Sequence, residues 1–410
     1  MLLLLLFSSL AILIVPRDTS SHEPVTTKVM FNREIVRIFQ RHCLACHNSG
    51  NITNISLATY PEARPWAKAF KEEVLEKRMP PYQAVKGFGD FRNDYSMTQH
   101  EIDQIVSWVE GGAPKGDDND LPKPAIGPDD WALGRPDLIL ETKKEANISS
   151  GDASEYRCVV LPTKLKGDRW LTAIDFRPGS GAVHCASFGI ESPAPNVDSS
   201  GCGAQSGSKD EVLGLLGTWM PGQTPMALPK NVARLLPARS RIVLRIHYQK
   251  GSEAVLSHGS LGLYLASGLG RNGLGMRPLH TLTLAAPAQD IPAGPDLYRV
   301  KLSHRMREAS EAITIRPLLF PLAKSVEVTA RRPDGSVEVL VWARDYRYDW
   351  QPQYDFKKPV PLPAGTAIEV TAYLDNSDNN PNNPNKPARA IRFASGLCEL
   401  SFVKVTRKIN

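Results

Sequence analysis

Trp170-Leu171-Thr172-Ala173-Ile174-Asp175-Phe176-Arg177-Pro178-Gly179 is a short run of branched and aromatic residues that ends in a proline-glycine turn. Such residues are enriched in strands, and proline and glycine punctuate them. Runs of the same kind recur in the second half of the chain, at 241–248, 325–330, 337–342 and 367–373, with turn residues between them. Many short strands separated by such turns predict β-sandwiches rather than a parallel sheet.

Before a polar linker, the spacing of apolar residues is typical of helices rather than strands. Residues 111–124 are rich in Gly, Asp and Pro and show no periodicity, and we assign residues 117–135 to the linker. Before it, apolar residues recur at helical spacing in 29–42, 66–75 and 101–109. Thr98 and Glu101 form a capping-box sequence that predicts where the last of these helices begins.

The first predicted helix leads into Cys43-Leu44-Ala45-Cys46-His47, a C-x-x-C-H motif. Two thiols at this spacing can each form a thioether with a haem vinyl group, and the adjacent imidazole can bind the iron. The alternatives are a redox dithiol and a zinc site, but the chain has no second C-x-x-C and no βαβ pattern around the motif. The motif therefore predicts haem c, covalently bound to Cys43 and Cys46 and ligated by His47.

The other side of the iron needs a second ligand. Met79 is the candidate, because Pro80 and Pro81 after it favour an extended loop that can hold a thioether against the haem. Met97 is the competitor, and His42 and His100 are the remaining options. In this order of elements the region resembles the class I cytochrome c family, which implies an all-α cytochrome c domain at residues 28–116.

The first residues and the net charge concern location and partners. Met1–Val15 is an apolar run of signal-peptide length, so we expect residues 1–21 to be a signal peptide or an N-terminal anchor and the protein to be exported, periplasmic or at the cell surface. The formal net charge of +6 is modest, and no basic block with interleaved aromatic residues indicates nucleic acid. We expect a redox partner protein, which the sequence does not identify, and no membrane span beyond the possible anchor.

Several separated segments of the strand-rich half share one further resemblance. They are Trp170–Gly179 leading to Val183-His184, Pro221-Gly222-Gln223 leading to Ile246-His247-Tyr248, Leu374–Ser377, and the asparagine-rich run 379–385. Together they resemble the copper type II, ascorbate-dependent monooxygenases, a family that includes the peptidylglycine hydroxylating enzyme and bacterial relatives fused to cytochrome c. The resemblance implies two all-β jelly-roll sandwich domains, at 136–284 and 285–410, after the all-α domain.

The copper ligands of that family are only partly present. Its first copper, held by three histidines, maps to His184, Cys185 and His247. The ligands of its oxygen-activating copper map to Leu318, Phe320 and a position near Leu397, and His304 and Met306 do not align with them. Leucine and phenylalanine have no lone pair for a metal, so we expect that second site to be lost.

Two interpretations remain for the group of His184, Cys185 and His247. Two imidazoles and a thiolate are the equatorial ligands of electron-transfer copper, so His184, Cys185 and His247 could retain copper. Neighbouring strand residues point to opposite faces, however, and joint ligation by His184 and Cys185 requires a bulge or a strand end. Without one, the two histidines would be a packed or hydrogen-bonded remnant.

The other cysteines are assigned from the resemblance and from their positions. The family implies a disulfide between Cys158 and Cys202. A link from Cys185 to Cys398 would have to cross between the sandwiches, so we expect both to be thiols.

Three classes of function follow from these residues. The first is an electron-transfer protein whose single haem cycles between ferric and ferrous iron, joined to a copper monooxygenase-like module. The second is a copper monooxygenase fed by the haem, which the missing ligands oppose. The third is a ligand-binding module with a redox-sensing haem.

Overall fold

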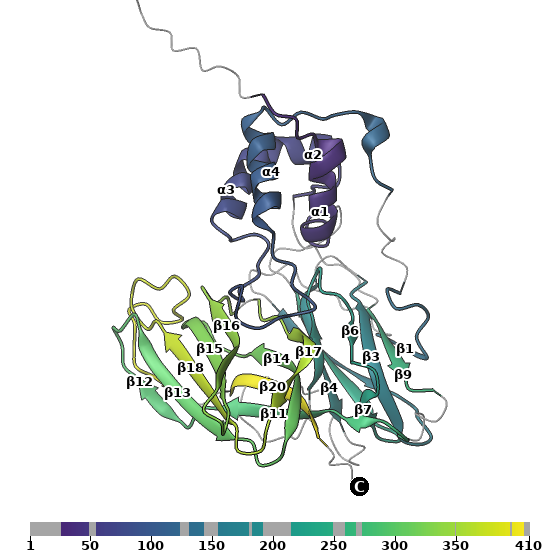
Figure 1. Cartoon of the computed structure of the whole chain (residues 1–410), viewed down its shortest axis with the longest axis vertical. Coiled ribbons are helices and arrows are strands. Elements are labelled where there is room, and N and C mark those ends of the chain that lie inside the picture. The colour runs from purple at the N-terminus through teal and green to yellow at the C-terminus, as the bar shows by residue number, and fades with distance from the viewer. Residues whose placement is uncertain are drawn as a thin grey trace, which may run out of the picture.

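The computed structural model describes residues 26–48, 55–123, 131–142, 155–179, 183–191, 215–248, 259–267, 273–348, 350–393 and 396–405. Among the described residues, strands account for 42% and helices for 14%, so this part of the chain is predominantly β. The strands form a broad body, and the short helices lie together on one end of it (Figure 1). The predicted signal segment at residues 1–21 lies outside the described residues.

The helices are short and share one small apolar core. They are a π-helical turn η1 (Phe31–Ile35), α1 (Val36–His42), α2 (Tyr60–Ala63), a 3-10 turn η2 (Arg64–Trp66), α3 (Ala67–Leu75), α4 (Gln99–Glu110) and a 3-10 turn η3 (Asp118–Asp120). The three expected helices are thus confirmed, and α4 begins at the predicted capping box, where Thr98 N donates to Glu101 Oε2 at 2.8 Å and Glu101 N donates to Thr98 Oγ1 at 3.3 Å. Trp108 and Ile105 of α4 are fully buried at the centre of this core.

The segment between α3 and α4 leaves the helices and enters the β body. Ala84 and Phe91 form bridges with Ala343 and Phe356, and both are buried in the C-terminal β core. Asn93 also donates from Nδ2 to the carbonyl oxygen of Gln353 at 2.6 Å. The helical region is therefore not a self-contained unit, because part of it completes a sheet core elsewhere.

The expected fold class is therefore wrong. An all-α cytochrome c domain followed by two all-β jelly-roll sandwich domains is not what the chain forms: within the described residues no all-α cytochrome c domain is present, and strands arranged in several sheets outnumber the short helices. The reason is physical, because helical periodicity reports only local burial, whereas residues 80–96 bury their apolar side chains against distant strands.

Two sheets enclose the core of the first half of the β body. The first sheet contains, in order, β1 (Leu138–Glu141), β9 (Ser260–Leu265), β3 (Arg169–Arg177), β7 (Val232–Leu236) and β10 (Arg277–Pro278), and β6 (Met226–Ala227) pairs with β3. The second sheet contains, in order, β2 (Glu155–Pro162), β8 (Arg241–Tyr248), β4 (Val183–Glu191) and β5 (Leu215–Trp219). Leu171 and Phe176 of β3 and Leu244 and Ile246 of β8 are buried together in this core.

Two four-stranded sheets enclose the core of the second half. One sheet contains, in order, β11 (His280–Ala285), β20 (Gly396–Lys404), β14 (Ser310–Pro317) and β17 (Tyr354–Leu362). The other contains, in order, β13 (Tyr298–Arg305), β18 (Ala367–Leu374), β15 (Ala323–Arg331) and β16 (Val337–Arg344). Outside these sheets, β12 (Gln289–Ile291) pairs with β19 (Ile391–Phe393). Strand β18 alternates strictly, with Ile368, Val370, Ala372 and Leu374 fully buried, as a strand with one face on a core should.

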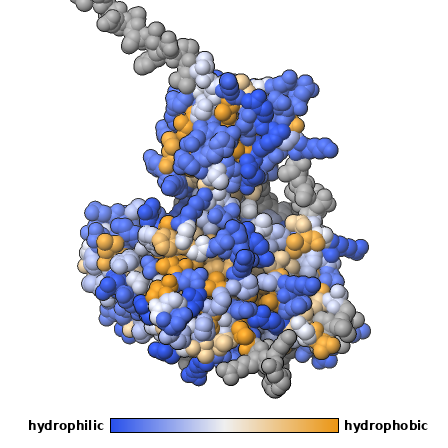
Figure 2. All heavy atoms as spheres, viewed as in Figure 1, coloured by the Kyte–Doolittle hydropathy of each residue, from blue (hydrophilic) through white to orange (hydrophobic). Residues whose placement is uncertain are grey.

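The two halves contact each other through a small apolar cluster of Val232, Leu279, Ile313 and Val403. On the face shown in Figure 2, the surface over the helices is mostly hydrophilic, and apolar residues gather over the β body. Among the described residues, no helix has the length and apolar character needed to cross a membrane.

Candidate functional site

The C-x-x-C-H motif continues α1 by one turn. Cys43 N donates to the carbonyl oxygen of Phe39, and His47 N donates to that of Cys43, both at 2.8 Å. Residues three and four apart on a helical turn are neighbours, so Cys43, Cys46 and His47 share one side of it. Cys43, Leu44 and Ile55 pack against the helical core and give this region an apolar wall.

The His47 ring is oriented by the backbone. Its Nδ1 lies 3.3 Å from the carbonyl oxygen of Ile55, which can only accept, so Nδ1 donates and Nε2 keeps its lone pair. Burial lowers the pKa of His47, although the bond to Ile55 acts in the opposite direction. The ring is therefore held in the neutral form, which can bind a metal through Nε2. Metal-binding histidines usually donate their other ring N–H to a carbonyl or carboxylate in this way.

The alternatives to haem attachment fit the motif less well. A reactive dithiol needs a lowered thiol pKa, whereas burial raises the pKa of Cys43 to about 12 and that of Cys46 to about 11. Zinc needs several ligand atoms that converge on one point. Among the described residues, the converging group is His184, Cys185 and His247, which does not include the C-x-x-C-H motif. Two neutral thiols beside an oriented imidazole fit a covalently bound haem.

The candidates for the second iron ligand lie in different surroundings. Met79 is half-buried and lies four residues after the end of α3, where its backbone N–H donates to the carbonyl oxygen of Glu73 at 3.2 Å. Met97 is 8% exposed and belongs to the helical core. His100 is exposed in the first turn of α4. Met79 stays the predicted ligand, with Met97 as its competitor.

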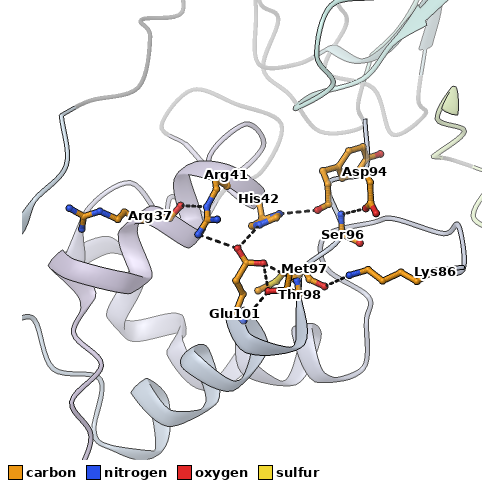
Figure 3. Close-up of polar contacts among 10 residues, drawn as sticks. Arg37, Arg41, His42, Lys86, Asp94, Ser96, Met97, Thr98 and Glu101 are labelled. Carbon is orange, nitrogen blue, oxygen red and sulfur yellow. Dashed lines mark hydrogen bonds and ion pairs between the residues drawn. The ribbon is translucent and has the colours of Figure 1, made fainter. Parts of the chain in front are cut away.

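His42 is held away from that role by a polar network around Glu101 (Figure 3). Its Nδ1 lies 2.9 Å from the carbonyl oxygen of Tyr95, and its Nε2 lies 3.1 Å from Glu101 Oε1. Arg41 reaches the same carboxylate oxygen at 3.1 Å. Both ring nitrogens of His42 are thus engaged, so this histidine ties α1 to α4 and to the segment before α4.

The motif also touches the first half of the β body. Cys46 Sγ lies 3.6 Å from the carbonyl oxygen of Pro221, in the loop that follows β5. The next residue, Gly222, has φ +80, and a Cβ on it would lie 2.9 Å from the Cβ of Ala45. A side chain at Gly222 would therefore be strained and would push the motif away from this loop.

The second candidate centre lies on neighbouring strands of that half. His184 and Cys185 are the second and third residues of β4, and Cys185 pairs with His247 of β8. The register shifts between Val183 and Cys185, as at a β-bulge, so the required irregularity is present. One ligand atom from each of His184, Cys185 and His247 lies within 4.8 Å of the others, and all three residues are half-buried.

The chemistry of this donor set favours an electron-transfer metal. The rings of His184 and His247 are 5.1 Å apart at 75°, so the two imidazoles meet edge to face. Imidazole and thiolate ligands suit copper, and two imidazoles with one thiolate match the equatorial set of electron-transfer copper sites. The residues therefore fit a single copper ion.

Apolar packing occupies the positions that the resemblance assigns to the oxygen-activating copper. Leu397 is fully buried, Leu318 N donates to its carbonyl oxygen at 2.9 Å, and the rings of Phe320 and Phe393 stack at 4.9 Å. His304 is on β13, and Met306 just after that strand is 4% exposed. The side chains of Leu318, Phe320 and Leu397 have no lone pair to donate to a metal.

The remaining cysteines differ from one another. Cys158 is in a disulfide, and its predicted partner Cys202 lies outside the described residues. Cys398 is a fully buried thiol outside any disulfide, as expected, and burial raises its pKa well above the usual range. Such a thiol is a packing residue rather than a reactive one.

Two aromatic residues near both centres were not predicted from the sequence. Trp350, in the loop between β16 and β17, has its ring 6.0 Å from that of His184 at 85°. Its Nε1 donates to the phenol oxygen of Tyr95 at 3.4 Å. No local sequence signal distinguishes these two from other aromatic loop residues, since only the fold brings them together.

Comparisons with known proteins do not assign the chain to a family. No family model and no curated protein matches it. Among solved structures, the cowpea mosaic virus top component is similar at 9% identity and TM-score 0.27 over 62% of this chain and 88% of that one. Infectious bursal disease virus, Gx strain, is similar at 8% identity and TM-score 0.21 over 70% and 76%. At these scores neither likeness supports an inference about fold or function.

Proposed function

We propose that this protein is an exported electron-transfer protein with one haem c, attached to Cys43 and Cys46 and ligated by His47. The observation that supports this most is the orientation of His47, whose Nδ1 donates to the Ile55 carbonyl and leaves Nε2 for a metal. The haem would supply one-electron chemistry, since its iron alternates between two oxidation states. Cys43 and Cys46 would anchor the group, the Ile55 carbonyl would keep the His47 imidazole oriented, and the helical core would supply an apolar wall.

A second redox centre is favoured by the β-bulge at His184. We propose that His184, Cys185 and His247 hold one copper ion, in a module similar to the copper type II monooxygenases but without their oxygen-activating site. Leu318, Phe320 and Leu397 offer no ligand, which opposes the monooxygenase alternative. The centre would then exchange single electrons with the haem.

Covalent haem attachment tests the first proposal. The full chain is expressed in a bacterium that attaches haem c in its periplasm, and haem is detected after denaturing electrophoresis. We expect one haem per chain, and loss of the covalent signal in Cys43→Ala/Cys46→Ala, whereas Cys185→Ser keeps it. A wild-type chain that folds but carries no covalent haem would overturn the proposal.

Metal analysis of the same haem-loaded protein tests the second. After copper loading and removal of excess metal, we expect one iron and one copper per chain and a thiolate-to-copper absorption band. Cys185→Ser should lose that band, and His304→Ala, which changes a histidine outside the group, should keep it. Two coppers per chain would contradict the loss of the oxygen-activating site, and no copper would reject the metal centre while leaving the haem proposal intact.

A further inference from the structure

The two candidate centres lie at one junction, although they belong to distant parts of the chain. Cys46 contacts the carbonyl oxygen of Pro221, which lies two residues after Trp219, and Trp219 pairs with Ala186 next to Cys185. On another side of the junction, Trp350 contacts both the ring of His184 and the phenol of Tyr95. The C-x-x-C-H motif and the metal cluster are therefore joined by direct contacts through few intervening residues.

The aromatic connection is a continuous chain of contacts. From the metal cluster it runs across 6.0 Å between the rings of His184 and Trp350, and then across the 3.4 Å hydrogen bond to Tyr95. The carbonyl oxygen of Tyr95 is 2.9 Å from His42 Nδ1, and His42 directly precedes Cys43. Electronic coupling decays less through bonds and hydrogen bonds than through empty space, so such a chain favours electron tunnelling.

Trp350 and Tyr95 are both held in place. Trp350 is 5% exposed, its backbone N–H donates to the Arg347 carbonyl at 3.1 Å, and its backbone carbonyl accepts from Gln83 Nε2 at 2.6 Å. The Tyr95 ring meets that of Tyr82 edge to face at 5.1 Å. Burial raises the pKa of Tyr95 to about 12, so its phenol stays protonated at neutral pH.

We propose that Tyr95 and Trp350 form the route by which an electron passes between the haem and the metal at His184, Cys185 and His247. The proposal rests on the two redox centres of the proposed function. One electron leaves the haem iron, which goes from ferrous to ferric, and reduces copper from cupric to cuprous. No bond forms or breaks, no proton moves, and neither aromatic residue changes its oxidation state.

The competing route runs through the backbone at Pro221. It would carry the electron from Cys46 across the 3.6 Å contact to the loop after β5 and then across the β5–β4 pairing to Cys185. Substitutions at Trp350 and Tyr95 would leave this route intact. The two routes are therefore separable by side-chain variants.

The test is the rate of electron transfer inside the loaded protein. The haem is reduced by a short light pulse with a soluble photoreductant, and its reoxidation by copper is followed from its absorption spectrum, at several protein concentrations to confirm a first-order process. We expect Trp350→Leu, which removes the ring, to slow this process by about tenfold or more, equivalent to about 1.4 kcal/mol in activation free energy. Tyr95→Phe, which removes the hydrogen-bond acceptor, should slow it in the same direction.

Matched controls separate the route from general disturbance. Tyr82→Phe changes the aromatic neighbour of Tyr95, and Tyr348→Phe changes an exposed tyrosine in the Trp350 loop. Both should keep the wild-type rate. The thiolate-to-copper band and both reduction potentials should be unchanged in every variant, which shows that the driving force is the same.

A second readout does not depend on electron transfer between the centres. Because Trp350 contacts His184, copper binding should quench part of the tryptophan fluorescence, and Trp350→Phe should lose that part while still binding copper. Equal rates and equal quenching in wild-type and variants would overturn the proposed route. Absence of haem or of copper from the wild-type protein would instead show that the proposed function has failed.

Discussion

Replacing Glu101 with alanine should destabilise the whole helical region, because one carboxylate joins α1, α4 and the segment before α4. The residue is 5% exposed. Its Oε2 accepts from Thr98 N at 2.8 Å and from Thr98 Oγ1 at 2.9 Å, and its Oε1 faces His42 Nε2 and Arg41 at 3.1 Å each. Alanine would leave all of these donors without this acceptor.

The size of the loss follows from these contacts. The capping interaction at Thr98 is worth about 1 kcal/mol. The bond from His42, which is nearly buried, is of the charge-assisted kind and is worth about 1.5–3 kcal/mol. Arg41 is 61% exposed, so its ion pair adds little. We therefore expect Glu101→Ala to lower the free energy of unfolding by about 3 kcal/mol at neutral pH.

The same carboxylate predicts a pH dependence. Burial tends to raise the pKa of Glu101, but hydrogen bonds from Thr98 and His42 and the charge of His42 outweigh it, and the pKa is lowered from its ordinary value of 4.5. A carboxyl whose pKa is lower in the folded state stabilises the fold above the unfolded pKa and loses that effect as the pH falls through the folded value. The difference between wild type and Glu101→Ala should thus shrink below pH 4.5.

Urea unfolding at neutral pH and at several values below pH 4.5 measures both effects. Asp103→Ala is the matched control on the same helix, since Asp103 is exposed and accepts one bond, from Gln99 Nε2 at 2.9 Å. It should change stability by no more than about 0.5 kcal/mol. If Glu101→Ala behaved like Asp103→Ala at neutral pH, or if its deficit did not depend on pH, the reasoning about this carboxylate would be refuted.

Three further predictions concern the haem ligand, the motif contact and the joined cores. Met79→Leu should abolish the thioether-to-iron absorption band and Met97→Leu should keep it; the reverse result would assign the ligand to Met97. Gly222→Ala should cost about 1–3 kcal/mol in urea unfolding, more than Gly87→Ala, which has φ +89 with nothing within 4 Å of an added Cβ, and equal costs would show that the Ala45 contact does not matter. Phe91→Ala should cost about 3–5 kcal/mol, with helical and strand signals lost in one transition; a separate helical transition would contradict the joined cores.

Local pattern predicted the individual elements well. Arg241–Tyr248 is β8 with the expected bounds, and the run from Trp170 to Phe176 lies within β3. The capping box at Thr98 fixed the beginning of α4. These features depend on propensity and on contacts a few residues away, which a sequence displays directly.

The errors concern contacts between distant residues. Phe91 carries no periodic signal, and its burial against Phe356 depends on a strand that local pattern cannot link to it. The bulge at His184 is likewise set by the register with β8, and the meeting of Trp350 with Tyr95 is set by loop positions. The sequence thus singled out His184, Cys185 and His247 as candidate ligands, but it could not show that they converge or which aromatic residues lie beside them.

The insertion of residues 80–96 into the C-terminal core has a consequence for biosynthesis. Asn93 and its partner Gln353 are 260 residues apart, so the helical region emerges from the ribosome long before the strands that complete its packing. Folding that waits for such distant contacts is slow and leaves apolar surface exposed in the meantime. The chain should therefore stay accessible to chaperones until synthesis ends, and C-terminal truncation should impair the packing around the N-terminal C-x-x-C-H motif as well.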